Sequence, residues 1–404
     1  MRIVQVNSFF SAGGTARIVN GIYDAAKAAG DECLVAAARG EMVYVMDSFR
    51  ICGKASVYGN AAAARMLDNE GFNGRISTMR LIDAILDYTP DVVHLHNLHG
   101  YYLNVGLLFD FLKVYGRPVV WTLHDCWAMT GHCAWFTSAQ CRKWSLPGGC
   151  DGDCCQRQEY PASWMLSKAR RNFQQKRESF TGVGNMNIVT PSMWLAGCVR
   201  HSMLKEYPVE VIYNGVDAEN KFLPMPNRVK DRYGIGGRQT MLLGVASPWN
   251  KRKGFDKFIE LAGRLGEEYV IVLIGVSCSQ RRSLPENIIA LPKMSDSELA
   301  EHYSAADLLL NLSEEETFGL VTVEALACGT PVLVLDSTAC PETVDDTCGI
   351  VVDTKSGIDG IEAAVTAGMW HSISPEACRL RALKFSAKKQ FHEYVQLYHS
   401  IGGG

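Results

Sequence analysis

The sequence predicts an α/β protein built from two Rossmann-like domains, each a doubly wound parallel sheet. The first observation is size, because 404 residues are more than one hydrophobic core usually holds. The second is rhythm: short apolar strands alternate with helical stretches along both halves of the chain, as in parallel α/β domains. The third is strand composition. Runs such as Val92-Val93 lack polar alternation, which indicates strands covered by helices on both faces.

The expected strands are short apolar runs, each followed by a helical stretch. In the first half they are Arg2–Asn7, Glu32–Ala37, Val92–Leu95, Val119–Leu123 and Ile188–Thr190. In the second half they are Met241–Val245, Val270–Ile274, Ile288–Leu291, Leu308–Leu312 and Val332–Leu335. The expected helices include Ile18–Ala29, Lys257–Leu265, Asp296–Ala305, Val321–Ala327 and Pro375–Ile401. Ser295 is expected to cap the third of these, with Glu298 in its first turn.

A turn and two prolines predict the boundary between the domains. Asn214-Gly215 is a turn signal, and Pro224 and Pro226 follow it, as expected of a linker. We therefore predict a first domain over residues 1–210, a second over 218–375, and a C-terminal helix over 376–404 that crosses back to the first domain.

The composition is that of an ordinary globular protein. Hydrophobic residues make up 47% and charged residues 21% of the chain, and the net charge of −3 gives no global attraction to nucleic acid. The chain enters its first strand at Arg2 without the apolar segment of a secretory signal. No stretch reaches the roughly 18 apolar residues that a spanning helix needs. We therefore expect a cytoplasmic protein with no nucleic-acid partner.

Glu316 and Glu324 are the most informative pair of residues. Glu316 follows an apolar strand, and Glu324 lies in a helical stretch that Gly329 and Pro331 end. A strand, a glycine-containing turn and a helix bring backbone N–H groups and the positive helix end to one point. A glutamate on each side of that turn could hold the hydroxyls of a sugar and of a ribose while the helix end faces phosphate, which suits a nucleotide sugar. A solvated loop and an ordinary helix charge are the alternative.

Two other turns carry groups that suit phosphate. Gly13 and Gly14 stand between the first strand and the first helix, and paired glycines let the backbone approach a charged oxygen closely. The third glycine of the dinucleotide fingerprint is missing. Lys251, Arg252 and Lys253 follow the first strand of the second half and could neutralise a diphosphate leaving group. A tight turn and a basic surface loop are the alternatives.

Six of the fourteen cysteines crowd into residues 126–155. Four of them, with an acceptable Cys150-x3-Cys154 spacing, could form a tetrahedral structural zinc site: Cys133, Cys141, Cys150 and Cys154. The segment is poor in periodic apolar residues, so a metal would help to hold it. Disulfides, which suit a cytosolic chain badly, and free thiols remain the alternatives.

Alternating histidines raise a rival function. His94, His96 and His99 could bind zinc on one strand face of a metal-dependent hydrolase. The dinuclear hydrolase pattern needs an aspartate directly before the third histidine, and Leu98 stands there. Such a hydrolase would also leave the glutamate pair and Lys253 unexplained.

Taken in order, these segments resemble the retaining glycosyltransferases of family 4, whose GT-B fold has two Rossmann-like domains facing across a cleft. The matching segments are Gly13-Gly14, Thr122-Leu123-His124-Asp125, Thr190-Pro191-Ser192, Asn214-Gly215-Val216-Asp217, Lys253-Gly254 and Glu316 to Glu324. They run over most of the chain, and the block from Glu316 to Val332 is the specific one. The segments around His94–Asn97 and Trp127–Cys133 look like the subgroup that works in colanic-acid and capsular polysaccharide synthesis.

The resemblance implies a role for each matching residue. It implies catalytic roles for His124, Glu316 and Lys253; donor binding by Gly13, Gly14, Arg252, Lys253, Phe318, Gly319, Leu320 and Glu324; and acceptor-side positions for His96, Asn97, His99 and Asp125. Lys253 would bind the diphosphate, Glu316 the transferred sugar and Glu324 the ribose. His124 would touch the donor sugar near the reaction centre.

The resemblance also implies a reaction: transfer of a sugar from a nucleoside diphosphate sugar to a glycan or lipid-linked acceptor, with retention. The acceptor hydroxyl would attack the face that the diphosphate leaves, and the leaving phosphate would take its proton, so no catalytic metal is expected. The family usually carries an arginine five residues before the lysine; Pro248 stands here, and Arg252 or Lys251 would have to supply that charge. A sugar-nucleotide-binding protein without turnover is a second rival, against which the intact His124 argues.

Lys168 to Arg177 is a basic helical stretch with few carboxylates. It could rest on an anionic membrane surface, which would suit a lipid-linked acceptor and a peripheral place at the inner face of the membrane. A solvated helix face is the alternative, and we favour it.

Overall fold

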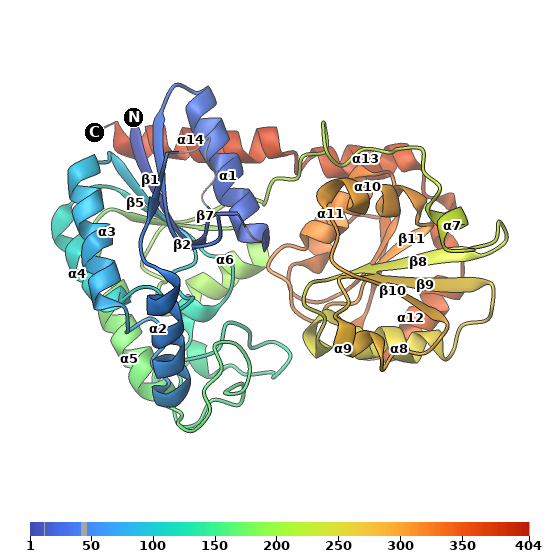
Figure 1. The fold of residues 1–404 in the computed structure, drawn as a ribbon, viewed down its shortest axis with the longest axis horizontal. Coiled ribbons are helices and arrows are strands. Elements are labelled where there is room, and N and C mark those ends of the chain that lie inside the picture. Colours follow the sequence, from blue (N-terminus) through green and yellow to red (C-terminus); the bar gives the residue numbers. More distant parts are fainter. Residues whose placement is uncertain (12, 42–46, 404) are drawn as a thin grey trace. The chain divides into compact units, whose positions relative to one another are not determined.

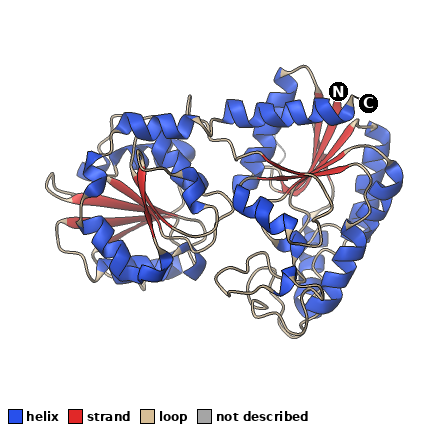
Figure 2. Ribbon diagram, turned by 180° about the vertical axis from the view of Figure 1, so that it is seen from behind, coloured by secondary structure: helices blue, strands red, loops and turns tan. Residues whose placement is uncertain are grey.

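The computed structural model describes residues 1–11, 13–41 and 47–403; Ala12 of the predicted glycine turn lies outside them. The chain divides into two compact units. Unit 1 comprises Met1–Tyr213 together with Gln390–Gly404, and unit 2 comprises Asn214–Lys389. In each unit helices cover both faces of a central sheet (Figures 1 and 2). The predicted α/β class with two Rossmann-like parallel sheets is therefore confirmed.

The sheet of unit 1 has seven parallel strands within the described residues, in the order β3-β2-β1-β4-β5-β6-β7. The strands are β1 (Arg2–Phe9), β2 (Glu32–Arg39), β3 (Ser48–Arg50), β4 (Val92–Leu95), β5 (Val119–Thr122), β6 (Met186–Thr190) and β7 (Val209–Val211). Ile3 of β1 pairs with Cys33 on one side and with Val92 on the other. The direction of winding therefore reverses between β1 and β4, and in such sheets the ligand binds outside the carboxyl ends of the strands at that point.

The sheet of unit 2 repeats this plan. Its six parallel strands in the described residues run in the order β10-β9-β8-β11-β12-β13. They are β8 (Thr240–Val245), β9 (Tyr269–Ile274), β10 (Ile288–Leu291), β11 (Leu308–Asn311), β12 (Val332–Leu335) and β13 (Gly349–Val352). The reversal of winding lies between β8 and β11, so the loops that leave these two strands are brought side by side.

All ten predicted strands are present, and the three that the sequence analysis missed lie at sheet edges. These are β3, β7 and β13. The first two have only three residues each, and none of the three is fully buried along its length. Their short, mixed sequences acquire strand geometry only from a neighbour, so they give no periodic signal of their own.

The helices of unit 1 are α1 (Gly13–Ala28), α2 (Lys54–Leu67), α3 (Arg75–Tyr88), α4 (Val105–Tyr115), α5 (Ala169–Phe180) and α6 (Met193–Arg200). Those of unit 2 are α7 (Val229–Arg232), α8 (Phe255–Ala262), α9 (Cys278–Arg281), α10 (Asp296–Ala305), α11 (Leu320–Ala327), α12 (Gly357–Thr366) and α13 (Pro375–Leu383). The predicted cap is present, because the Ser295 hydroxyl accepts a hydrogen bond from Glu298 N and the Glu298 side chain returns one to Ser295. Helix α1 begins at Gly13 rather than at Ile18, so the glycine pair forms its first turn.

The C-terminal stretch, predicted as one helix, forms two: α13 and α14 (Ala387–Gly402). The break occurs where Ser386 makes a β-bridge with Val216, whose backbone exchanges hydrogen bonds with Phe385 and Ala387. Helix α14 then carries the chain back into unit 1. There Tyr398 bonds to His94 of β4.

Lys176 holds the irregular segment that follows β5 in place through hydrogen bonds. It belongs to the stretch predicted to be a basic surface, but its side chain is only 1% exposed. Its ammonium donates to the carbonyls of Trp127 and Thr130 at 2.8 and 3.1 Å and lies 3.5 Å from the centre of the Trp127 ring. Burial lowers the pKa of Lys176 from 10.5 to about 7, although nearby thiols and carboxylates act in the opposite direction.

The depressed pKa makes stability depend on pH. Between about pH 7 and pH 10 an unfolded lysine binds a proton that Lys176 in the folded state does not, so the free energy of unfolding should rise with pH by up to about 1.4 kcal/mol per pH unit. We expect this rise in urea titrations of the wild type and a flatter profile in Lys176→Met. Parallel profiles for the two proteins would contradict the assignment.

Candidate active site

In unit 1 the polar side chains lie at the carboxyl ends of the central strands. His96 follows β4 and His124 follows β5, and the His96 Nδ1 atom is 3.1 Å from His124 Nε2. The second ring nitrogen of His96, Nε2, is 3.0 Å from Gln5 Oε1 of β1. His96 is buried, whereas His124 is half-exposed. Burial lowers the pKa of His96 well below 6.5 and that of His124 to about 4, so both rings are neutral at pH 7.

A second cluster joins the segment after β4 to the segment after β5. His99 Nε2 is 2.6 Å from Asp125 Oδ2, and His99 Nδ1 is 2.8 Å from the Tyr160 hydroxyl. Asp125 Oδ1 also accepts from Trp127 N at 2.9 Å. Burial would raise the pKa of Asp125, but His99 and the Trp127 N–H lower it below its ordinary value. The imidazole and its carboxylate therefore form a fixed pair.

The first turn of α1 lies beside the same strand ends. Asn97 Nδ2 donates to Thr15 Oγ1 at 3.3 Å, and the Asn97 carbonyl accepts from the Tyr102 hydroxyl at 2.7 Å. Gly13 has φ +85°, and a Cβ added there would meet no atom within 4 Å. The start of α1 therefore leaves room for a group that approaches its backbone N–H groups.

The structure does not assemble the rival metal site from the three histidines. His94 Nδ1 lies 2.5 Å from the Tyr398 hydroxyl and His94 Nε2 lies 2.8 Å from Thr122 Oγ1. Both nitrogens are thus engaged in the core. Across the described ranges 1–11, 13–41 and 47–403, no group of three or more His, Cys, Asp or Glu side chains is placed to hold a metal ion.

The absence of a group placed to hold a metal ion in the described residues also applies to the cysteine cluster. All fourteen cysteines lie in the described residues as free thiols. Cys133 and Cys154 hydrogen-bond to each other, and Cys150 Sγ accepts from Gly131 N at 3.2 Å. Within the described ranges, the four predicted ligands, Cys133, Cys141, Cys150 and Cys154, do not form a group placed to hold a metal ion, and the structural zinc stays a prediction.

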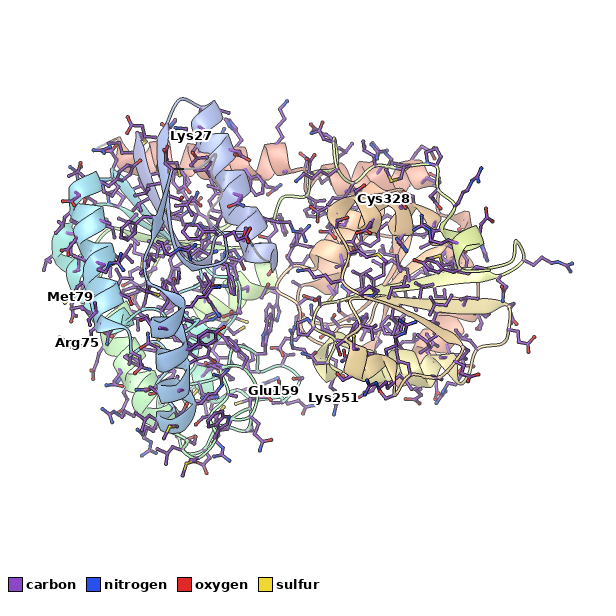
Figure 3. All side chains as sticks on the ribbon, viewed as in Figure 1. Lys27, Arg75, Met79, Glu159, Lys251 and Cys328 are labelled. Atoms are coloured by element: carbon purple, nitrogen blue, oxygen red, sulfur yellow. The ribbon has the colours of Figure 1, made fainter. Side chains whose placement is uncertain are left out.

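In unit 2 a short basic turn, η3 (Lys251–Lys253), follows β8. The Asn250 side chain caps it by accepting from Lys253 N at 3.0 Å. Gly254 ends it with φ +76°, and a Cβ added there would approach the Leu312 carbonyl closer than 3.0 Å. Only glycine allows this turn to pack against the end of β11. Lys251, the other cation that the sequence predicted for phosphate binding, is exposed at the surface of the unit (Figure 3).

The turn η3 contacts the loop that follows β11. Lys253 Nζ pairs with Glu316 Oε1, and Lys257 Nζ pairs with Glu314 Oε1. Arg252 Nη1 donates to the Glu315 carbonyl at 2.8 Å, and Glu314 N donates to the Arg252 carbonyl at 2.8 Å. The two loops are therefore tied by backbone bonds as well as by charge.

Glu316 is a buried carboxylate held in its ionised form. Burial alone would raise its pKa, but Lys253 and Arg252 lower it below its ordinary value. Its backbone N–H donates to Thr338 Oγ1 at 2.9 Å. A fixed anion beside two cations can accept hydrogen bonds from hydroxyls while the cations face phosphate.

Helix α11 begins directly after this loop. Gly319 supplies its N-cap with φ 91°, and Asn311 Nδ2 donates to Thr322 Oγ1 at 3.0 Å across the strand–helix junction. Glu324 is buried, and its Oε2 accepts from the Tyr303 hydroxyl at 2.9 Å. Phe318 packs in the core against Phe385, so only its backbone can face a ligand.

The structure thus brings together two sets of predicted residues, one in each unit. The set in unit 1 is Gly13, Gly14, His96, Asn97, His99, His124 and Asp125, and the set in unit 2 is Arg252, Lys253, Phe318, Gly319, Leu320, Glu316 and Glu324. Sequence reasoning missed their supports, Gln5, Tyr160 and Tyr303. Only Gln5 gave a signal, as a polar residue inside the apolar run of the first strand.

Two doubly wound units with polar loops at the reversal of each sheet define a two-domain Rossmann-like protein. Two family models match the chain: Glycosyltransferase Family 4 over residues 12–220 and Glycosyl transferases group 1 over residues 232–381. A putative colanic acid biosynthesis glycosyl transferase of Escherichia coli strain K12 is 23% identical over 354 residues, which cover 85% of this chain and 84% of that protein.

Solved structures share the fold. Sucrose-phosphate synthase from Thermosynechococcus elongatus is similar with a TM-score of 0.72 at 15% identity, over 99% of this chain and 98% of that one. An Anabaena protein in complex with UDP and glucose is similar with a TM-score of 0.67 at 14% identity, over 99% and 100% of the two chains.

Because the first family model matches just over half of the chain, the chain belongs to glycosyltransferase family 4. It is a retaining, hexosyltransferase-type glycosyltransferase with the GT-B fold. The family match, together with the bonding of both His94 nitrogens in the core, argues against the metal-dependent hydrolase.

The packing of η3 against β11 predicts the effect of a single methyl group. Gly254→Ala should lower the free energy of unfolding of unit 2 by about 2–4 kcal/mol, because a left-handed conformation is strained with a Cβ and the Leu312 carbonyl must move. Gly237→Ala is the matched control, since a Cβ there meets nothing within 4 Å. Urea unfolding that gave equal midpoints for the two variants would contradict the role of Gly254.

Proposed function

We propose that unit 2 binds a nucleoside diphosphate sugar and that the enzyme transfers the sugar to a glycan or lipid-linked glycan in surface polysaccharide synthesis. The observation that carries the proposal is the pairing of Lys253 with Glu316. It joins the loops after β8 and β11, at the reversal of the sheet where such folds bind ligands. The UDP and glucose in the similar Anabaena structure, and the colanic acid relative, support the substrate classes.

The proposal gives each group in unit 2 a task that its position supports. Lys253 and Arg252 neutralise the diphosphate as it leaves, and the start of α11 adds its backbone N–H groups. Arg252 thereby replaces the arginine that is absent at Pro248. Glu316 accepts hydrogen bonds from hydroxyls of the transferred sugar, and Glu324, oriented by Tyr303, binds the ribose.

Unit 1 supplies the residues for the sugar and for the acceptor. Gly13 and Gly14 at the start of α1 offer backbone N–H groups to a phosphate, and His124 offers a ring nitrogen to a sugar hydroxyl. His96, Asn97, His99 and Asp125 line the acceptor side.

Retention then needs no enzyme nucleophile. The acceptor hydroxyl attacks the face of the sugar that the diphosphate leaves, and the departing phosphate oxygen takes the hydroxyl proton. Glu316 is poorly placed to serve as a nucleophile, because its charge is neutralised by Lys253. The protein contributes orientation and charge stabilisation at the phosphates.

The two glutamates should respond differently to substitution. Glu316→Gln should lower kcat about 100-fold, because the carboxylate acts on the sugar as charge develops. Glu324→Gln should mainly raise the KM for the donor and the Kd for UDP, by about 10-fold. Steady-state kinetics and UDP titration measure both.

Glu314→Gln is the matched control, since Glu314 lies in the same loop but faces Lys257. Its kcat should stay within about twofold of the wild type. An unchanged kcat in Glu316→Gln, or a melting temperature that UDP and every other nucleoside diphosphate fail to raise, would contradict the proposal.

A peripheral membrane location is part of the proposal for unit 1. None of the helices in the described ranges is long and apolar enough to cross a membrane. Trp164, Met165 and Leu166 are nevertheless 64%, 73% and 41% exposed, directly before the basic residues of α5. Trp164 N donates to the Arg65 carbonyl at 2.8 Å, which fixes this apolar group against α2. Apolar and basic side chains together suit an anionic membrane surface.

This surface predicts selective vesicle binding. The wild type should sediment with phosphatidylglycerol vesicles at low salt but not with phosphatidylcholine vesicles, and the double variant Trp164→Ser/Met165→Ser should lose most of the bound fraction. Met369→Ser, which removes a 66% exposed methionine of unit 2, should bind as the wild type does. Equal sedimentation of wild type and double variant would contradict the membrane role.

A further inference from the structure

A chain of three hydrogen bonds, two of them buried, leads from α1 to His124. Gln5 Nε2 is 3.1 Å from the Val19 carbonyl. Gln5 Oε1 is 3.0 Å from His96 Nε2, and His96 Nδ1 is 3.1 Å from His124 Nε2. Gln5 and His96 are closed to solvent, so water cannot substitute for either partner in the bond between them.

The first link fixes the direction of all the others. A backbone carbonyl can only accept, so the Gln5 amide nitrogen must face Val19. Gln5 Nε2 also donates to Cys33 Sγ at 3.5 Å, which agrees with this orientation. The amide oxygen therefore faces His96 and can only accept.

The protons of both imidazoles follow from that orientation. His96 must carry its proton on Nε2, the atom that faces Gln5 Oε1. Because the ring is neutral, its Nδ1 has a lone pair and accepts from His124 Nε2. His124 is neutral too, so its own lone pair lies on Nδ1. The His94 ring lies 3.9 Å from the His96 ring but takes no part in this chain.

We propose that Gln5 and His96 are positioning residues that hold His124 in its Nε2–H tautomer, so that His124 Nδ1 accepts a hydrogen bond from a hydroxyl of the sugar substrate. The use of that nitrogen rests on the proposed function, whereas the tautomer rests on the hydrogen bonds and on the neutral state of both rings. A histidine with mixed tautomers would offer the hydroxyl a donor for part of the time, and that fraction of the enzyme would hold the sugar wrongly.

The tautomer can be measured without any substrate. In full-length protein labelled with ¹⁵N-histidine, long-range ¹H–¹⁵N correlation spectra at pH 7 should show His124 with a protonated Nε2 and an unprotonated Nδ1. The His124 signals are those lost in His124→Asn. In His96→Phe and Gln5→Leu both nitrogen shifts of His124 should move toward intermediate values, because the tautomers then exchange.

Kinetics separate positioning from mere support of the fold. Both variants should lower kcat about 10-fold or more and change the donor KM less than about twofold, because ground-state binding through the phosphates is kept. His94→Phe is the matched control. It removes a neighbouring buried histidine and should lower the melting temperature, but it should leave the His124 shifts at their wild-type values.

The outcomes distinguish this inference from the proposed function. A protonated Nδ1 on His124 in the wild type, or unchanged His124 shifts in both variants, would overturn the inference even in an active enzyme. The predicted tautomer in a protein that binds no nucleoside diphosphate would support the inference about the tautomer while the proposed function failed.

Discussion

The reversal of winding in each sheet is the constraint on which the candidate site residues of each unit depend. Parallel strands present all their carboxyl ends at one edge, and a doubly wound order separates the helices of neighbouring strands only at the reversal. Polar loops can meet there without displacing a helix. In unit 2 the loops after β8 and β11 meet in this way, which brings Lys253 to Glu316. In unit 1 the same geometry places Asn97 beside the start of α1.

Each charge buried near these strand ends is neutralised or bonded locally. Lys176 has two carbonyls and an aromatic face, and Asp125 has His99 and a backbone N–H. An uncompensated buried charge costs about 3–5 kcal/mol, so these contacts are conditions for folding as well as for function. They also fix the side chains in advance, which lowers the cost of orienting a substrate.

The sequence was sufficient for the central strands and for most of the polar residues that lie at their carboxyl ends, but not for the residues behind them. A buried strand such as β4 and a block such as Glu316 to Glu324 carry local signals of apolar runs, turns and spacing. Tyr303 and Tyr160 carry none, because their hydroxyls find partners 21 and 61 residues away. The edge strands β3, β7 and β13 were missed for the same reason. Their structure depends on a neighbour that only the tertiary fold supplies.

The two glutamates show why residue type and spacing under-determine a role. Both are buried carboxylates at one strand–helix junction, yet their partners differ. Glu316 faces the ammonium of Lys253, which favours the ionised form of the carboxylate. Glu324 faces the hydroxyl of Tyr303, a neutral donor that fixes direction without neutralising charge. A carboxylate held by an ammonium suits the reacting sugar, whereas one oriented by a hydroxyl suits the part of the donor that stays unchanged. The proposed difference in role between Glu316 and Glu324 thus rests on the side chain that each carboxylate contacts, Lys253 or Tyr303.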